Sequence, residues 1–208
     1  MAYDFADKNE VKEAALWCEG ILKAVQQEVN DSFTFDFRLI GSGERKLVTQ
    51  NGDEPFDLDY NIILQRDKKG MLNDPKRIKN LFRTKLDAVL KRSIKRYEPG
   101  YSRDSTSVLT TNVTIGTEIE FSFDVAIIAE NDNGHFCRIT HVKDAREYIW
   151  NQLPNSVDFM EKFSSIKRDG FWVKFKARYL EEKNEHLRRQ TGIKSFSIFL
   201  ETINEFYQ

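Results

Sequence analysis

The stretch from Phe37 to Leu64 constrains the fold of this 208-residue chain more than any other part of its sequence. Apolar and polar residues first alternate with the period of two expected of a β-strand, and this run stops at Gly41-Ser42-Gly43. After a polar turn at 51–55, a second alternating run places Asp57 and Asp59 on the polar face of a strand. The sequence therefore predicts a strand, a short helical turn and an acidic strand in succession.

The two acids of this second strand predict a metal site. Carboxylates two residues apart on a strand point the same way, about 7 Å apart. No basic residue lies between Asp57 and Asp59 to offset their repulsion. Because hard divalent cations prefer oxygen ligands, we expect Mg²⁺ or Mn²⁺ at these carboxylates.

A third acid follows on a later strand. The run from Glu118 to Ile128 alternates in the same way and places Asp124 on its polar face. The segment 105–115 is rich in Thr and Val and predicts a preceding strand that turns at Gly116-Thr117. A hairpin of these two strands would place Asp124 beside Asp57 and Asp59.

These motifs together resemble a known family. A strand that ends in Gly-Ser, an Asp-x-Asp strand and a third Asp on a later strand are the signature of the polymerase-beta-like nucleotidyltransferases, and the resemblance covers about residues 33–128. The segment between Ser42 and Asp57 is longer than in most members. The polar turn at 51–55 accounts for this difference, since insertions at exposed loop tips cost little free energy.

The resemblance implies a reaction and a role for each residue. Such an enzyme moves a nucleoside monophosphate from a nucleoside triphosphate to a hydroxyl group and releases pyrophosphate. Asp57 and Asp59 would bridge two cations, and Asp124 would hold the cation that activates the hydroxyl. The residues expected at the phosphates are Gly41, Ser42, Arg45 and Lys46.

The remainder of the chain predicts an α+β protein with a mixed sheet. A helix is expected over 8–29, and helical patterns are expected over 144–153, 156–166, 171–190 and 194–207. We therefore predict a catalytic core at 1–143 and a helical lobe at 144–208 that closes the nucleotide cleft. In the family a basic residue of this lobe reaches the triphosphate, and Arg178 is the expected match.

A second long helix is expected over 76–96, and its composition is unusual. It carries a single acid, Asp87, and nine basic residues: Lys76, Arg77, Lys79, Arg83, Lys85, Lys91, Arg92, Lys95 and Arg96. One interpretation is a solvated surface; the other is contact with RNA, DNA or an acidic protein.

The composition of the chain also bears on which classes of protein it can belong to. The 32 basic and 33 acidic residues give a net charge of −1, so no global field attracts nucleic acid or membrane. Cys18 and Cys137 form no Cys-x-x-Cys motif, and no signal peptide is evident, which favours a reducing cytoplasm without disulfides. No apolar run is long enough to cross a bilayer, and the three histidines lack zinc-site spacing.

The acceptor and the preferred base of the nucleotide stay open at this stage. The long hairpin before Phe123-Asp124-Val125 and the helical lobe favour the bacterial second-messenger and oligoadenylate-synthetase-like branch, although the proline usual after the third acid is absent at 125–128. A product would then be a signalling oligonucleotide or a cyclic dinucleotide. The alternatives are an antitoxin-like transferase that modifies a partner protein or RNA, and a non-catalytic module that binds nucleic acid or protein through the helix at 76–96.

Overall fold

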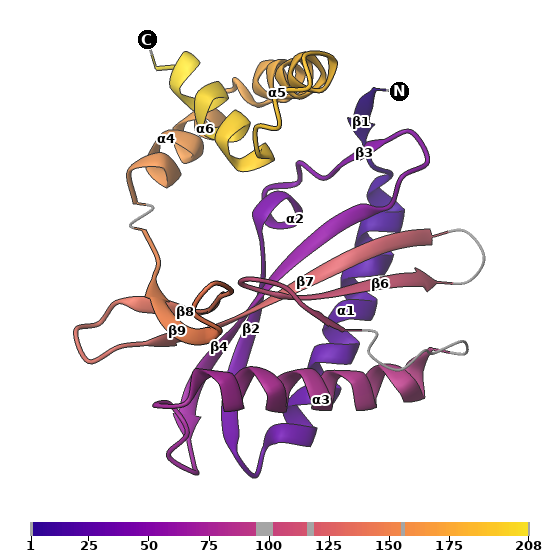
Figure 1. Cartoon of the computed structure of the whole chain (residues 1–208). Coiled ribbons are helices and arrows are strands. Elements are labelled where there is room, and N and C mark those ends of the chain that lie inside the picture. Colours follow the sequence, from indigo (N-terminus) through magenta and orange to yellow (C-terminus); the bar gives the residue numbers. More distant parts are fainter. Residues whose placement is uncertain (1, 95–101, 116–118, 155–156, 208) are drawn as a thin grey trace. The chain divides into compact units, whose positions relative to one another are not determined.

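The computed structural model describes residues 2–94, 102–115, 119–154 and 157–207 (Figure 1). Contacts divide the chain into two units. The smaller unit comprises Met1–Ala6, Thr49–Glu54 and Pro154–Gln208. The larger unit comprises Asp7–Val48 and Pro55–Leu153, and it holds all three acids predicted to bind metal.

A mixed seven-stranded sheet forms the centre of the larger unit. Strands β2, β4, β7, β6 and β5 are neighbours in that order, and β8 pairs with both β7 and β9. The pair β4–β7 is parallel and the others are antiparallel. The strands are β2 Phe33–Ile40, β4 Phe56–Asp67, β5 Arg103–Asp104, β6 Leu109–Ile115, β7 Ile119–Glu130, β8 Phe136–Val142 and β9 Glu147–Gln152. The predicted α+β class with a mixed sheet is confirmed.

Two helices, α1 (Lys8–Val29) and α3 (Pro75–Ser93), cover one face of this sheet (Figure 1). The Asp7 side chain caps α1 by accepting hydrogen bonds from two backbone N–H groups of the first turn, and Asp74 caps α3 by accepting one, from the Arg77 N–H. Tyr60 of β4 donates a hydrogen bond to the Ala15 carbonyl, 3.2 Å away, from the buried side of the sheet. The core of the larger unit therefore lies between this face and the helices, and the acids lie on the opposite face.

The smaller unit joins the chain's N-terminal strand to three C-terminal helices. Strand β1 (Tyr3–Phe5) pairs with β3 (Thr49–Asn51), which leads into the polar turn predicted at 51–55. The helices are α4 Val157–Arg168, α5 Trp172–Arg188 and α6 Ser195–Glu205. Their core is aromatic, since the rings of Phe163, Phe175 and Phe199 lie within 6.0 Å of one another.

One predicted helix is wrong. Residues 144–153, expected to be helical, contain strand β9, and the segment before it forms turns. The strand forms because β8 offers a pairing edge and because two aromatic side chains find distant partners: Tyr148 donates to Asp104 (2.5 Å) and Trp150 to the Leu72 carbonyl (2.7 Å). Periodicity within one segment does not reveal such partners.

The other helix predictions are close to the structure. The helix expected over 8–29 is α1, and the last three helices match α4, α5 and α6 within a few residues. Helix α3 ends at Ser93, where Ile94 is extended, and not at the predicted residue 96. The turn expected at 116–117 lies outside the described residues. The predicted boundary at 143/144 falls inside the β8–β9 pair, while the predicted roles of the two parts stay predictions.

Candidate active site

The site is built on two parallel neighbours, β4 and β7. Their register places Asp59 directly beside Asp124 and Asp57 beside Ser122. Because side chains alternate along a strand, all four lie on the face that α1 and α3 leave uncovered. The predicted meeting of the third acid with the first two is therefore observed in the register of the sheet.

The electrostatics of the acids reflect this proximity. Burial raises the pKa of Asp59 to about 6, with further contributions from the Asp124 and Asp57 carboxylates, while Arg45 acts in the opposite direction. Burial likewise raises the pKa of Asp124, and a hydrogen bond from Thr110 partly offsets the rise. Without a cation, keeping these carboxylates ionised together therefore costs free energy.

The donor set fits hard divalent cations. One carboxylate oxygen of Asp124, Oδ1, is buried and has no hydrogen-bond partner in the described part of the chain. The Asp57 carboxylate accepts a hydrogen bond from Ser122 Oγ. Within the residues that the structure describes, no three His, Cys, Asp or Glu side chains already converge as a metal shell. Asp57 would have to turn from Ser122 to join one.

Gly41 contacts the acids directly. It starts the short helix α2 (Gly41–Arg45) with a left-handed φ of 67°. A Cβ at this position would lie 2.5 Å from Asp59 Oδ2, so only glycine fits between the turn and the carboxylate. The glycine expected at the phosphates therefore has a second role, because it lets Asp59 approach the turn.

Ser42, Arg45 and Lys46 follow in the same turn. The Ser42 carbonyl accepts a hydrogen bond from the Leu47 N–H (2.9 Å), which closes α2. Arg45 is near enough to the acids to lower the pKa of Asp59. Lys46 is exposed and caps α2 with a left-handed backbone. Arg45 is thus the cation of this turn that the structure brings to the acids.

Arg178 lies in the smaller unit, on α5. Its guanidinium forms ion pairs with Glu205 (2.7 Å), Glu181 (2.9 Å) and Glu182. These three acids give the side chain a structural role within its own unit. Its assignment to the triphosphate stays a prediction.

Two residues of the site were missed in the sequence. Ser122 is two positions before Asp124 on β7, so the same alternation that selected Asp124 could have selected it. Thr110 lies opposite Asp124 on β6, and its position depends on the register of the hairpin. Sequence alone does not fix that register.

The basic residues of helix α3 are less available to bind nucleic acid or an acidic protein than the composition of the helix indicates. Lys79 is only 2% exposed and forms an ion pair with Asp104, 2.6 Å away. Lys85 (3.4 Å) and Arg92 (2.7 Å) both pair with Glu28 of α1. The structure thus uses three of the nine basic residues inside the larger unit, and Lys95 and Arg96 lie outside the described residues.

Among the helices described, none is long and apolar enough to span a membrane.

The fold is shared with solved bacterial proteins, although no family model and no curated protein sequence matches the chain. The structure of E. coli MS115-1 CdnC with ATP superposes with a TM-score of 0.57 at 10% identity, over 95% of this chain and 59% of that one. The Rhodothermus marinus CdnE c-UMP-AMP synthase, solved with Apcpp and Upnpp, gives 0.55 at 13% identity, over 97% and 72%. CdnC in its complex with HORMA-deltaN gives 0.54 at 12% identity, over 93% and 57%.

These comparisons define the class of the fold. The chain shares the nucleotidyltransferase fold of CdnC and of the CdnE synthase, which agrees with the fold that the sequence motifs predicted. It spans about 59% of the length of the CdnC chain. Identities of 10% and 13% establish the shared fold and leave the activity to be argued from the residues.

Proposed function

We propose that this protein is a metal-dependent nucleotidyltransferase. It would move a nucleoside monophosphate from a nucleoside triphosphate to a hydroxyl acceptor and release pyrophosphate. One observation carries the proposal: Asp59 and Asp124 lie side by side on parallel strands, and a buried oxygen of Asp124 has no partner among the described residues. A buried acceptor without a donor is costly unless a ligand satisfies it.

The three acids would have different roles in the reaction. Asp57 and Asp59 would hold the cation that binds the triphosphate, and Asp124 would help to hold the cation at the attacking hydroxyl. Two bound Mg²⁺ or Mn²⁺ ions supply charge stabilisation for the attacking and leaving oxygens. The Asp124 carboxylate would also accept the proton of the hydroxyl group.

The turn at Gly41 would receive the phosphates. Its glycine and the Ser42 hydroxyl offer a close approach, and Arg45, already near Asp59, would add positive charge against the triphosphate. Lys46, exposed at the end of α2, is the second cation of this turn. These contacts would bind and orient the donor together with Asp57 and Asp59, and Asp124 would act on the acceptor.

For the acceptor, we favour a second nucleotide, so that the product is a signalling oligonucleotide or a cyclic dinucleotide. The likeness to CdnE, a c-UMP-AMP synthase, supports this choice at the level of fold. The alternative is transfer to RNA or to a partner protein.

The test is a labelling experiment. The protein is incubated with each labelled nucleoside triphosphate and Mn²⁺, alone and with cell extract, and products are resolved into small molecules, RNA and protein. A small nucleotide product formed without extract would support a nucleotide acceptor, whereas label in RNA or protein would support transfer to RNA or to a partner protein.

The double variant Asp57→Asn and Asp59→Asn should abolish every labelled product. Asp132→Asn, an exposed loop aspartate, is the matched control and should leave labelling unchanged. Absence of any product, from folded protein, would contradict the proposal.

A further inference from the structure

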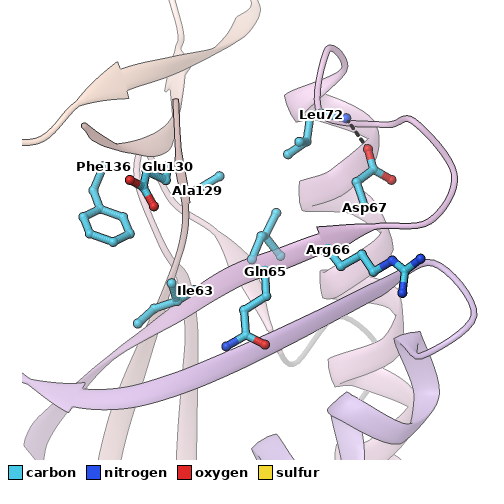
Figure 2. Close-up of a pocket in the computed structure, with 9 residues that line it drawn as sticks. Ile63, Gln65, Arg66, Asp67, Leu72, Ala129, Glu130 and Phe136 are labelled. Carbon is cyan, nitrogen blue, oxygen red and sulfur yellow. Dashed lines mark hydrogen bonds between the residues drawn. The ribbon is translucent and has the colours of Figure 1, made fainter. Parts of the chain in front are cut away.

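A cavity of about 350 Å³ opens on the same sheet face as the acids, at the far end of β4 and β7 (Figure 2). Ile63 and Gln65 come from β4, Glu130 from the end of β7 and Phe136 from the start of β8. Glu130 and Phe136 are register partners, so their side chains share this face. The volume falls in the range of small-molecule sites.

The walls of the cavity are apolar and open to solvent. Phe136 is 44% exposed and Leu72 is 39% exposed, which is unusual for such large apolar side chains unless they serve a ligand or partner. Ile63 of β4 adds a third apolar side chain to the lining. A flat ring placed against Phe136 would bury this surface, and aromatic rings stack favourably on nucleobases.

The polar atoms of the cavity are hydrogen-bond acceptors. The side-chain carboxylate of Glu130 is exposed and forms no hydrogen bond or ion pair with any described residue. Gln65 donates its Nε2 to Asp36 Oδ2, 2.6 Å away, which leaves its Oε1 as an acceptor. The Asp67 carboxylate is already used by the backbone N–H groups of Lys69 (2.9 Å) and Leu72 (2.8 Å).

The cavity lining carries both signs of charge, with more acids than bases. Arg66 also lines the cavity, and its guanidinium points away from Glu130 and Phe136 (Figure 2). Glu130 and Asp67 carry two negative charges against the single positive charge of Arg66, so the lining is acidic by one charge. The cavity thus combines apolar walls, acceptor atoms and a small negative charge.

We propose that this cavity binds a guanine base. Guanine presents two adjacent donors, N1–H and the N2 amino group, and a carboxylate accepts both in one plane. Glu130 would accept this pair, Gln65 Oε1 would accept a further N–H, and the ring would stack on Phe136. Adenine has no N1–H donor, and hypoxanthine lacks the amino group, so both leave acceptors unpaired.

The site is separate from the catalytic acids. The rise along β7 from Asp124 to Glu130 is about 20 Å, which is the length of about six stacked nucleotides. The guanine therefore belongs either to a free nucleotide bound apart from the acids or to an oligonucleotide that follows the open face. Binding at this cavity does not depend on the reaction proposed for the acids.

The experiment is an NMR titration of the ¹⁵N-labelled, metal-free full chain with guanosine, inosine and adenosine. We expect guanosine to shift amides of 63–67 and 129–136, with inosine weaker by about tenfold and adenosine weaker still. Glu130→Gln and Phe136→Ala should each lower the affinity for guanosine by about tenfold or more. The amide spectrum of each variant should still be that of a folded protein. Lys76→Ala, at an exposed position that does not line the cavity, is the control and should keep wild-type affinity.

Two further comparisons complete the test. An RNA of about six nucleotides with guanine at its 5′ end should bind much more tightly than guanosine if the base belongs to an oligonucleotide, and equally if it belongs to a free nucleotide. Agmatine, a guanidinium without a ring, should not compete. Equal affinity for guanosine and adenosine, competition by agmatine, or no shift at these amides would each overturn the proposal. The Asp57→Asn and Asp59→Asn double variant should still bind guanosine, so failure of the catalytic proposal would be recognised separately.

Discussion

Asp59 of β4 and Asp124 of β7 are register partners on parallel strands, and each has a pKa that burial raises above the ordinary value. Two ionised carboxylates held side by side repel each other, and a cation bound between them removes this repulsion.

Asp124→Asn should lower turnover by several orders of magnitude and leave binding of the nucleoside triphosphate measurable. The reason is that Asp57, Asp59 and the turn at Gly41 would still hold the donor, while the hydroxyl would have lost its metal ligand and base. Product formation and calorimetric binding, measured on the same sample, separate the two effects. Turnover near that of the wild type would remove Asp124 from the mechanism.

Asp59→Asn should stabilise the metal-free protein at pH 8 by about 1–3 kcal/mol. The folded-state pKa of Asp59, about 6, lies above its ordinary value of 3.8. A carboxyl with a raised pKa contributes stability that is fully present below pH 3.8 and lost as the pH rises through 6, and asparagine avoids this loss. Denaturant unfolding at pH 8 and pH 4 measures the difference, which should shrink at the lower pH.

Mg²⁺ provides the control for that measurement. Added Mg²⁺ should stabilise the wild type at pH 8, because it binds the folded state alone, and should stabilise Asp59→Asn much less. An equal effect of Mg²⁺ on both proteins would show that Asp59 does not bind the cation.

Gly41→Ala should destabilise the larger unit by about 1–3 kcal/mol and weaken metal binding. The new Cβ would meet Asp59 Oδ2 at 2.5 Å, so the carboxylate must move. Gly70→Ala is a matched control, since Gly70 has nearly the same φ, 65°, and no described neighbour within 4 Å of an added Cβ. Equal effects of the two substitutions on Mg²⁺ affinity would contradict the close contact between Gly41 and Asp59.

Lys79→Met should lower the free energy of unfolding by about 2–4 kcal/mol, because it leaves Asp104 without its buried partner. Lys76→Met, on the exposed surface of the same helix, should change it by less than about 0.5 kcal/mol. Thermal or denaturant unfolding of both variants checks this. Similar values would mean that the ion pair of Lys79 with Asp104 contributes little to stability.

RNA affinity should show little dependence on salt if α3 is a solvated surface. Since Lys79, Lys85 and Arg92 are paired within the unit, we expect no more than a shallow slope of log affinity against log salt. A slope near −0.7 for each of several phosphate contacts, abolished by Arg83→Glu with Lys91→Glu, would instead favour the nucleic-acid-binding hypothesis.

The sequence by itself determined what depends on neighbours along the chain. Capping residues and apolar spacing predicted α1, and the period of two placed Asp57, Asp59 and Asp124 on polar strand faces. The break at Gly41 predicted the turn that became α2. These features follow from the geometry of single elements, so a local pattern is sufficient to find them.

Only the tertiary structure decided which of these elements meet. The parallel register that sets Asp59 beside Asp124, the pairing of β1 with β3, and the replacement of a predicted helix by β9 all join segments far apart in the chain. The cavity at Glu130 and Phe136 likewise needs the register of β7 with β8. Strand pairing is chosen by long-range packing and hydrogen bonding, and these interactions leave no period in the sequence of either partner.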